Sequence, residues 1–174
     1  VLDGKFKVDR RIFLGASLND KKEKYLALNE IVIHSGALAQ MIEFELYIDN
    51  VFVYRQKADG IIVSSPTGST AYSLSGGGPI IHPSVEAITL LPMFPHSLNT
   101  SPLVVNDNSN IIIKMTGTRG KAKLNMDSHD SLSLKKGDQV KISKNDTDLL
   151  LIHPLDHNFY SGCRNKLGWS SSIS

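Results

Sequence analysis

The sequence has almost none of the features that mark disulfide-bonded, zinc-binding or membrane-spanning proteins. Its 174 residues include one cysteine, Cys163, so no intramolecular disulfide and no Cys-x-x-Cys zinc site is possible. No apolar run approaches the roughly 20 residues of a transmembrane helix, and the N-terminus lacks the apolar stretch of a signal peptide. These absences predict a cytoplasmic protein with no membrane partner.

Strong charge and phosphate-binding motifs are also missing. The formal net charge is only +2 and the basic residues are scattered, which argues against a nucleic-acid partner. Neither G-x-x-x-x-G-K-[ST] nor G-x-G-x-x-G occurs, so the chain has no Walker loop and no Rossmann fingerprint. The six histidines share no ligand spacing, and Pro154 prevents a helix that would align His153 with His157. We therefore predict no metal site.

What the sequence does contain is a succession of short strand patterns. Pro92 places its strand at a sheet edge because proline cannot donate to a ladder, and Asp49-Asn50 predicts a tight hairpin turn. Alternating or continuous apolar residues predict strands at 6–16, 25–34, 41–48, 51–54, 61–63, 87–93, 103–105, 111–115, 121–126, 131–134, 139–143 and 149–152.

Only the tail has a helical period. Phe159, Tyr160, Cys163 and Leu167 share one helix face, and Gly168 ends it. The predicted fold class is therefore mainly β, an antiparallel two-sheet β-sandwich with a short helix after the loop at 67–72 and a helical C-terminal tail. We expect residues 1–155 to form the sandwich domain and residues 156–174 the tail.

The most distinctive stretch runs from Asp59 to Pro83 and reads DGIIVSSPTGSTAYSLSGGGPIIHP. A strand-length apolar run leads into a hydroxyl-rich loop, then one or two helical turns capped by Thr67 or Ser69 and ended by Gly76, then a triple glycine. Such a unit offers backbone N–H groups, hydroxyls and bare backbone to a ligand. The residues alone support a ligand loop and a tight structural turn equally.

Asn29 and Glu30 interrupt an otherwise apolar strand pattern. Adjacent strand residues face opposite sides, so one of the two is buried or at a bend, and a buried carboxylate needs hydrogen-bond donors. Ribose hydroxyls are suitable donors, and so are backbone amides at a strand end. Asp59, before Gly60, poses the same choice between a turn-forming residue and a ligand acceptor.

The residues allow two possible functions of this stretch to be compared. A serine hydrolase would use Ser69 with His82, but the nucleophile elbow G-x-S-x-G lacks its second glycine at Ala71, so this function is disfavoured. A non-enzymatic nucleotide-binding or ligand-sensing β-sandwich remains an alternative.

Three blocks, LNEIVIH, DGIIVSSPTGSTAYSLSGGGPIIHP and LLPMFPHSLNTSPLVV, closely resemble the C-terminal domain of bacterial NAD kinases. The resemblance extends over essentially the whole chain. It implies transfer of the ATP γ-phosphate, with Mg²⁺, to the adenosine-ribose 2′-hydroxyl of NAD, which gives NADP. It also implies a homodimer or homotetramer that binds NAD and NADP.

The resemblance further implies which residues line the dinucleotide site. Glu30 and Asn29 would hold ribose and adenine edges, and Asp59 the nicotinamide carboxamide. Asp127-Ser128-His129 stands where the family often has Asp-Gly-Gln, a departure that leaves any role for this turn in doubt. The full set of implied NAD-binding residues is Asn29, Glu30, Asp59, Thr67, Thr70, Ala71, Tyr72 and Ser75.

A family motif is absent from residues 1–174. Gly-Gly-Asp-Gly belongs to a separate N-terminal lobe of the family, and its aspartate is proposed to activate the 2′-hydroxyl. Without it, and without an initial methionine, we expect a fragment that holds NAD but has no catalytic residue and meets ATP only through that lobe. In the intact family the tail packs on this lobe, so we expect exposed apolar surface at Phe159, Tyr160, Leu167 and Trp169.

Overall fold

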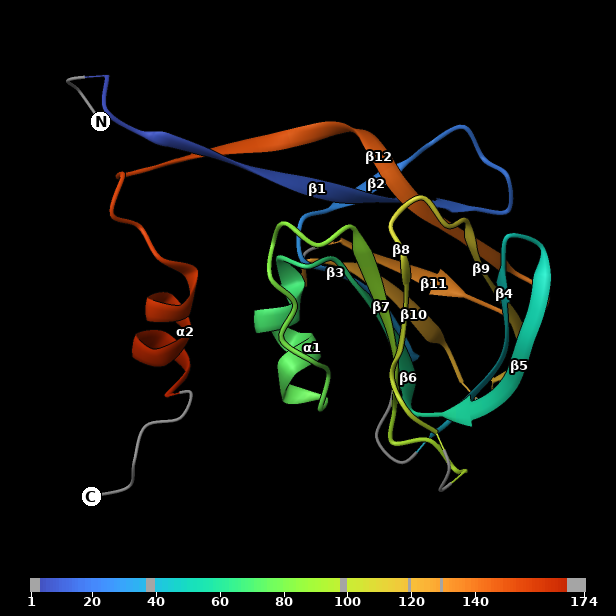
Figure 1. The fold of residues 1–174 in the computed structure, drawn as a ribbon. Helices are drawn as coiled ribbons and strands as arrows, with labels where there is room; N and C mark the ends of the chain where they lie inside the picture. Colours follow the sequence, from blue (N-terminus) through green and yellow to red (C-terminus); the bar gives the residue numbers. More distant parts are fainter. Residues whose placement is uncertain (1–3, 37–39, 98–99, 119, 129, 169–174) are drawn as a thin grey trace.

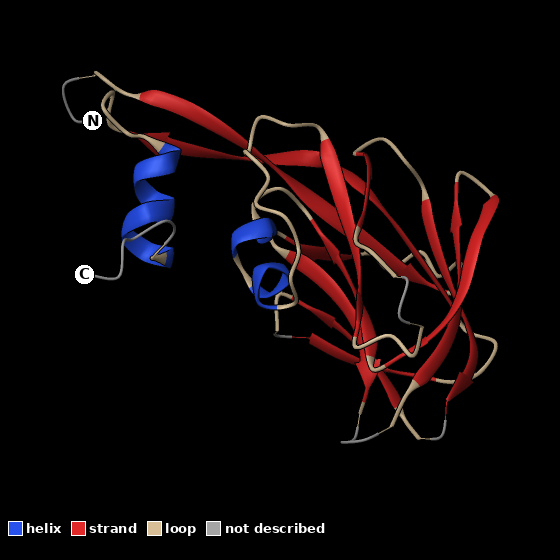
Figure 2. Cartoon of the chain, turned by 60° about the horizontal axis from the view of Figure 1, so that its bottom comes forward, coloured by secondary structure: helices blue, strands red, loops and turns tan. Residues whose placement is uncertain are grey.

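The computed structural model describes residues 4–36, 40–97, 100–118, 120–128 and 130–168. These residues form two antiparallel sheets of six strands, packed face to face (Figures 1 and 2), and the predicted fold class is confirmed. A 3-10 turn, Gly68–Thr70, precedes helix α1, Tyr72–Ser75, and helix α2 is Phe159–Leu167. The strands are β1 Lys7–Leu18, β2 Tyr25–Ala27, β3 Glu30–Ser35, β4 Ile42–Ile48, β5 Val51–Ala58, β6 Gly60–Ser64, β7 Ala87–Met93, β8 Leu103–Asn106, β9 Ile111–Thr118, β10 Ala122–Met126, β11 Asp130–Leu134 and β12 Gln139–His153.

The core lies between the two sheets. Sheet A has the strand order β2-β1-β12-β9-β4-β5, and sheet B has the order β11-β10-β3-β6-β7-β8. Leu14, Phe44 and Ile113 of sheet A pack in one cluster with Ile33 and Ile61 of sheet B, and all five are 0% exposed. Full burial of one such side chain stabilises the fold by about 1.5–3 kcal/mol, which explains why the alternating patterns of the sequence settle into facing sheets.

Strands β1 and β12 form a ribbon that reaches past the sandwich toward α2 (Figure 1). We predicted separate strands at 139–143 and 149–152, but β12 is one continuous strand, so that prediction is wrong. Lys144 pairs with Leu14 and Asp148 with Ile12, and the register with β1 shifts between these two pairs. Polar side chains on this ribbon face solvent or an ion partner, as in the Arg10–Asp148 pair at 3.4 Å. A strand that is open to solvent keeps its ladder without apolar residues.

The chain crosses from one sheet to the other at Leu28 and Asn29. Strand β2 pairs with β1 in sheet A, whereas β3 pairs with β6 and β10 in sheet B. The single strand predicted over residues 25–34 is therefore wrong. The polar pair Asn29-Glu30 marks the place where the backbone leaves one ladder and enters the other.

The clearest predicted hairpin is present. Strands β4 and β5 pair from Ile42↔Ala58 to Ile48↔Val51, with Asp49 and Asn50 at φ values of 50° and 65°. Asparagine and aspartate tolerate this left-handed region better than other side chains do, which suits a tight turn between twisted strands.

Strand β7 is not at the edge of its sheet, so that prediction is wrong. It lies between β6 and β8. Pro92 nevertheless lies where one side of β7 has no neighbouring strand, because β8 pairs with β7 only from Ala87 to Leu90. The missing N–H of Pro92 therefore interrupts no ladder on that side.

The predicted tail helix is present as α2. The Asn158 side chain accepts a hydrogen bond from the Ser161 N–H at 3.1 Å, and Gly168 ends the helix at a φ of 63°. The Phe159 ring meets the His82 ring edge-on, at a centroid distance of 4.9 Å. Trp169 lies outside the described residues. Within the described ranges, no helix is long and apolar enough to cross a membrane.

Candidate functional site

The candidate site is built on the loop that follows β6, and Ser65 bonds this loop to the crossover segment. Its Oγ donates to the Leu28 carbonyl at 2.6 Å and accepts from the Gly68 N–H at 3.2 Å. The Ser65 N–H donates to the Asn29 carbonyl at 2.9 Å. Gly68 leaves no room for a side chain, because a Cβ there would lie 2.1 Å from that same carbonyl oxygen. Loop and crossover therefore form one unit.

Ser69 has a structural role in this loop. It is fully buried, its Oγ donates to the Pro66 carbonyl at 2.6 Å, and it accepts from the Ile81 N–H at 3.0 Å. Within the described residues neither Thr67 nor Ser69 caps the following turns with its side chain, so the predicted cap is wrong. A hydroxyl enclosed among backbone partners also does not suit a hydrolase nucleophile. Gly76 ends α1 as predicted.

Asp127 supports the crossover from the neighbouring hairpin. Its carboxylate accepts hydrogen bonds from the consecutive N–H groups of Leu28, Asn29 and Glu30 at 2.5, 2.8 and 3.0 Å. Asp127 and Ser128 have φ values of 45° and 65°, which turn the chain between β10 and β11. The role that the sequence left in doubt is therefore structural: Asp127 positions the Asn29-Glu30 pair.

Glu30 is the most unusual ionisable group of the site. It is only 4% exposed, and its Oε2 has no hydrogen-bond partner among the described residues. Burial, which has the largest effect, and the neighbouring Asp127 carboxylate together raise the pKa of Glu30 to about 7, while a hydrogen bond from the Tyr72 backbone N–H opposes the shift. The carboxyl group therefore changes charge near neutral pH and has a free acceptor oxygen.

Four other predicted residues lie on the same loop. Thr67 begins the 3-10 turn, and the Thr70 Oγ1 donates to the Thr67 carbonyl at 3.3 Å. Ala71 joins this turn to α1, where the Tyr72 N–H reaches the Glu30 carboxyl group and the Tyr72 side chain is 44% exposed. The structure thus brings Asn29, Glu30 and the 67–72 loop together.

A cavity of about 510 Å³ opens beside α1 on the outer face of sheet B. Tyr72 and Ser75 line it, as predicted residues, together with Ile62, Leu91 and Phe94, which sequence reasoning missed. The sequence did contain a signal, because β6 and β7 are continuously apolar rather than alternating, as expected for strands covered on both faces.

Asp59 lies apart from the other predicted residues. It precedes β6, whereas Glu30 pairs with Ser64 at the other end of that strand. A strand of five residues spans roughly 16 Å at about 3.3 Å per residue. Within one chain, Asp59 therefore does not join the Glu30 cluster.

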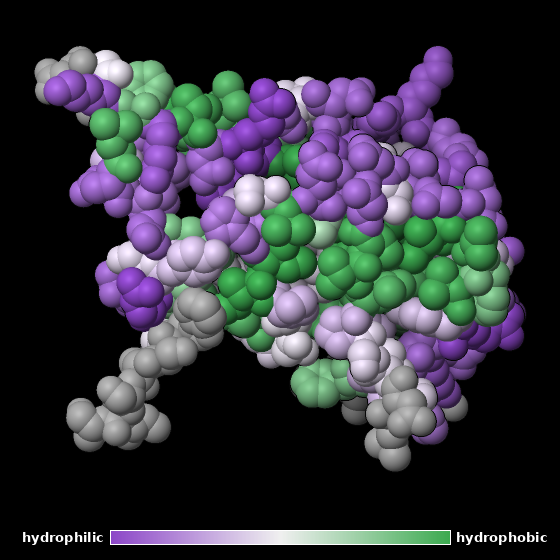
Figure 3. Space-filling view, viewed as in Figure 1, coloured by the Kyte–Doolittle hydropathy of each residue, from purple (hydrophilic) through white to green (hydrophobic). Residues whose placement is uncertain are grey.

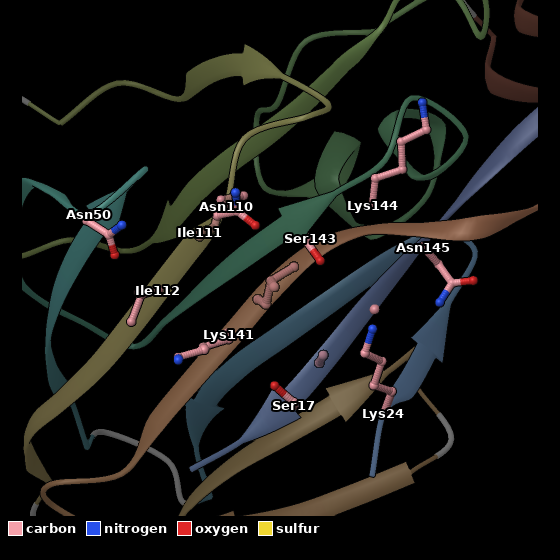
Figure 4. A pocket seen from close by; sticks show the side chains of 13 residues that line it. Ser17, Lys24, Asn50, Asn110, Ile111, Ile112, Lys141, Ser143, Lys144 and Asn145 are labelled. Atoms are coloured by element: carbon pink, nitrogen blue, oxygen red, sulfur yellow. The ribbon is translucent and has the colours of Figure 1, made fainter. Parts of the chain in front are cut away.

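A separate polar groove of about 330 Å³ crosses the outer face of sheet A (Figure 4). Two of its lysines are already paired, Lys141 with Asp20 at 2.5 Å and Lys144 with Asp107 at 2.7 Å. The groove includes none of the predicted site residues. Within the described part of the chain, no group of three or more histidine, cysteine, aspartate or glutamate side chains is placed to hold a metal ion.

Comparison with known proteins shows the family of the chain. A family model described as the ATP-NAD kinase C-terminal domain matches residues 28–154. The chain belongs to this family. The matched segment of this NAD kinase domain includes every predicted site residue, and the resemblance inferred from the three sequence blocks is confirmed.

Named relatives and solved structures support the same family. The chain is 49% identical to the NAD kinase of Teredinibacter turnerae over 175 residues, which cover 98% of this chain and 60% of the relative. It is 45% identical to that of Escherichia coli over 176 residues, covering 99% and 60%. The chain therefore spans about three fifths of the length of these relatives.

Two solved structures share the fold. Yeast NADH kinase complexed with NADH superposes with a TM-score of 0.88 at 29% identity, over 97% of this chain and 52% of that one. An NAD kinase from Archaeoglobus fulgidus in complex with ATP gives a TM-score of 0.75 at 30% identity, over 95% and 62%.

The raised pKa of Glu30 predicts a pH-dependent stability difference. Below pH 4.5 the carboxyl group is protonated in both states, and above about 7 it is ionised in both, so the wild-type protein loses stability between these limits. Glu30→Gln, neutral throughout, should gain stability relative to wild type as pH rises through this window. Urea unfolding at a series of pH values measures it; a pH-independent difference would contradict the assignment. Glu23→Gln, at an exposed glutamate, is the control and should shift stability by less than about 0.5 kcal/mol.

Asp127→Asn should destabilise the domain. Asparagine keeps the shape and tolerates the φ of 45° but loses the charge that strengthens the three N–H bonds, so we expect a loss of about 2 kcal/mol in urea unfolding. The pKa of Glu30 should also fall, because a neighbouring negative charge is removed. Asp146→Asn, at an exposed aspartate of β12, is the matched control. Equal stability of the two variants would show that the Asp127 contacts contribute little.

Proposed function

We propose that this chain is the dinucleotide-binding part of an NAD kinase, which transfers the γ-phosphate of ATP to the adenosine-ribose 2′-hydroxyl of NAD and forms NADP. The observation that carries the proposal is the buried Glu30 carboxyl group, with its free Oε2, beside the 67–72 loop. The family match and the NADH-bound relative support a dinucleotide as ligand.

The residues of the site suit the parts of such a ligand. The Glu30 carboxyl group would accept hydrogen bonds from ribose hydroxyls, which supply the partner that its Oε2 lacks. Asn29 presents an amide to adenine edges, and Thr70, Ala71 and Tyr72 form a wall for the adenosine. Ser75 extends this wall into the cavity beside α1, where the apolar floor suits a planar ring.

ATP and Mg²⁺ would be held by protein segments that this chain does not contain. Residues 1–174 have no Gly-Gly-Asp-Gly, and the described residues offer no metal-ligand cluster. The ATP-bound archaeal relative supports ATP as the phosphoryl donor in the longer kinases. In this proposal the chain positions the acceptor hydroxyl and supplies no catalytic residue. The single cysteine and the lack of long apolar runs favour a cytoplasmic location.

We propose that the chain forms a homodimer or homotetramer. Apolar side chains form a band across one face of the sandwich (Figure 3). The large apolar side chains exposed in the described part of the chain include Val51, Phe52, Val53, Phe94 and Val104. The position of Asp59 supports the same proposal. Asp59 is roughly 16 Å from the Glu30 cluster within one chain, and in the proposed oligomer it completes the dinucleotide site of a second copy.

We also propose that residues 156–174 pack on the N-terminal lobe in the intact kinase, while residues 1–155 form the dinucleotide-binding domain. Helix α2 contacts the sandwich through Phe159, yet Tyr160 is 50% exposed and Leu167 is 38% exposed. These side chains would be covered by that lobe.

The chain should bind NAD without phosphorylating it. Isothermal titration calorimetry should detect NAD binding by the wild-type chain, weaker in Glu30→Gln while circular dichroism stays unchanged. A coupled assay with ATP and Mg²⁺ should detect no NADP, because the family's catalytic aspartate motif is absent. Absence of NAD binding would reject the proposed function. Robust NADP formation would reject only the proposal that the chain binds NAD without catalysing phosphoryl transfer. It would mean that a residue within 1–174 acts as the catalytic base.

Mixing two damaged chains tests the shared site. Asp59→Asn and Glu30→Gln should each weaken every NAD site of a homo-oligomer. After subunit exchange, a mixed dimer would contain one site with both native carboxylates, so about a quarter of all sites should regain wild-type affinity. Titration of the mixture with NAD, with light scattering to establish the oligomeric state, measures this fraction. No recovery in a confirmed oligomer would show that Asp59 does not complete the site of a second copy.

A further inference from the structure

Arg11 is a largely buried arginine beside the candidate site. It lies on β1 of sheet A next to Arg10, but the Arg10 side chain is 73% exposed and the Arg11 side chain only 11%. Withdrawing a guanidinium group from water is unfavourable unless it gains ionic and hydrogen-bond partners. Strand formation alone does not explain this burial, because Arg10 belongs to the same strand and its side chain is exposed.

The partners of Arg11 connect sheet A with the loop of sheet B. Its Nη2 lies 2.5 Å from the Asp9 Oδ2, and its Nη1 donates to the Thr67 Oγ1 at 3.4 Å. Arg11, Pro66, Thr67 and Pro83 line a common cavity of about 200 Å³ between ribbon and loop. Its Nε is enclosed and has no partner among the described residues. The guanidinium group thus contacts Thr67 from the side of the ribbon, with the Arg11 side chain only 11% exposed.

This contact determines which hydrogen-bond role Thr67 has left. A guanidinium group only donates, so the Thr67 hydroxyl oxygen accepts from Arg11 and its own proton remains available to donate. The Thr67 side chain makes no capping bond to the 3-10 turn within the described residues, so that proton is not used there. Thr67 is consequently prepared to donate to an oxygen or ring nitrogen of a ligand.

Asp9 in turn holds Arg11. The carboxylate is two residues away on the same face of β1, and its Oδ2 also lies 3.5 Å from the His153 Nε2 of β12. Since residues 7–12 of β1 pair without interruption with residues 148–153 of β12, Asp9 has a rigid base. Sheet A therefore fixes the orientation of the Arg11 guanidinium group, and this group in turn donates to the Thr67 hydroxyl.

We propose that Arg11 is a positioning residue for dinucleotide binding: held by Asp9, it orients the Thr67 hydroxyl as a donor to the bound ligand. This inference rests on the proposed function, because it assumes that the 67–72 loop contacts NAD. It adds to that function a residue of the opposite sheet, which acts through Thr67 and does not touch the ligand.

Calorimetric titration with NAD tests the inference on four chains: wild type, Arg11→Gln, Arg11→Lys and the matched control Arg10→Gln. Loss of a charged hydrogen bond should raise the Kd of Arg11→Gln roughly tenfold. Arg11→Lys should also bind more weakly, because a single ammonium group does not reach Asp9 and Thr67 together. Arg10→Gln should stay within about twofold of wild type. Arg10 lines the same cavity, but its side chain is 73% exposed and pairs with Asp148, and within the described residues no hydrogen bond joins it to Thr67.

A double-mutant cycle with Thr67→Val separates positioning from a general effect on folding. If Arg11 acts through the hydroxyl, its substitution should cause no further loss of NAD affinity in the Thr67→Val background. A purely structural role would lower the thermal midpoint equally in both backgrounds without coupling in affinity. Should Arg11→Gln not fold, Arg11→Lys completes the same cycle.

The outcomes distinguish the two proposals. Wild-type chain that binds no NAD overturns the proposed function and this inference with it. Wild-type binding, together with an Arg11→Gln or Arg11→Lys affinity equal to that of Arg10→Gln, overturns only the role of Arg11. Additive losses in the cycle also overturn it, because they would mean that Arg11 and Thr67 act independently.

Discussion

The Asp127 carboxylate, bound by the N–H groups of Leu28, Asn29 and Glu30, is the contact on which the arrangement of the site depends. At this point the backbone leaves sheet A and enters sheet B, so its N–H groups have no ladder partners. A buried unpaired N–H is destabilising by about 1–3 kcal/mol, and one carboxylate satisfies all of them. Burial raises the pKa of Glu30 and the Asp127 carboxylate adds to this shift, so the structural contact also affects the functional group.

Hydroxyl groups perform a similar task in the loop after β6. Ser65 and Ser69 are fully buried, and both use their hydroxyls to satisfy backbone groups of the loop or of neighbouring segments. Such a loop needs no apolar residues to remain rigid, because its polar groups are paired. The exposed members of the loop, Tyr72 and Ser75, are left free to face a ligand.

The site thus lies where both sheets contribute. Glu30 and the 67–72 loop belong to sheet B, while Arg11 and Asp9 reach the loop from the ribbon of sheet A. The sandwich is a rigid frame. At the crossover, backbone N–H and C=O groups are available that would be paired with a neighbouring strand in a continuous ladder. A ligand site at a crossover between sheets follows from this constraint.

The sequence predicted the architecture well, because alternation of apolar and polar residues reports directly which face of a strand is buried. Strands such as β4 and β5, their Asp49-Asn50 turn and the tail helix follow from local pattern and turn chemistry. Most residues of the candidate site were predicted from the family resemblance, because they lie in one contiguous stretch of the sequence. The interruption at Asn29-Glu30 was visible as an anomaly, although its cause, a change of sheet, was not.

Tertiary structure alone decided the contacts between residues distant in sequence. Nothing local to Asp127 indicates that it binds residues 28–30, and nothing in β1 distinguishes buried Arg11 from exposed Arg10. Likewise, residues 144–148 lack a strand pattern yet belong to the single strand β12, and Asp59 is close to the loop in sequence but at the far end of β6. Periodicity reports the burial of one element, whereas the partner of a buried polar group is set by the packing of several elements at once.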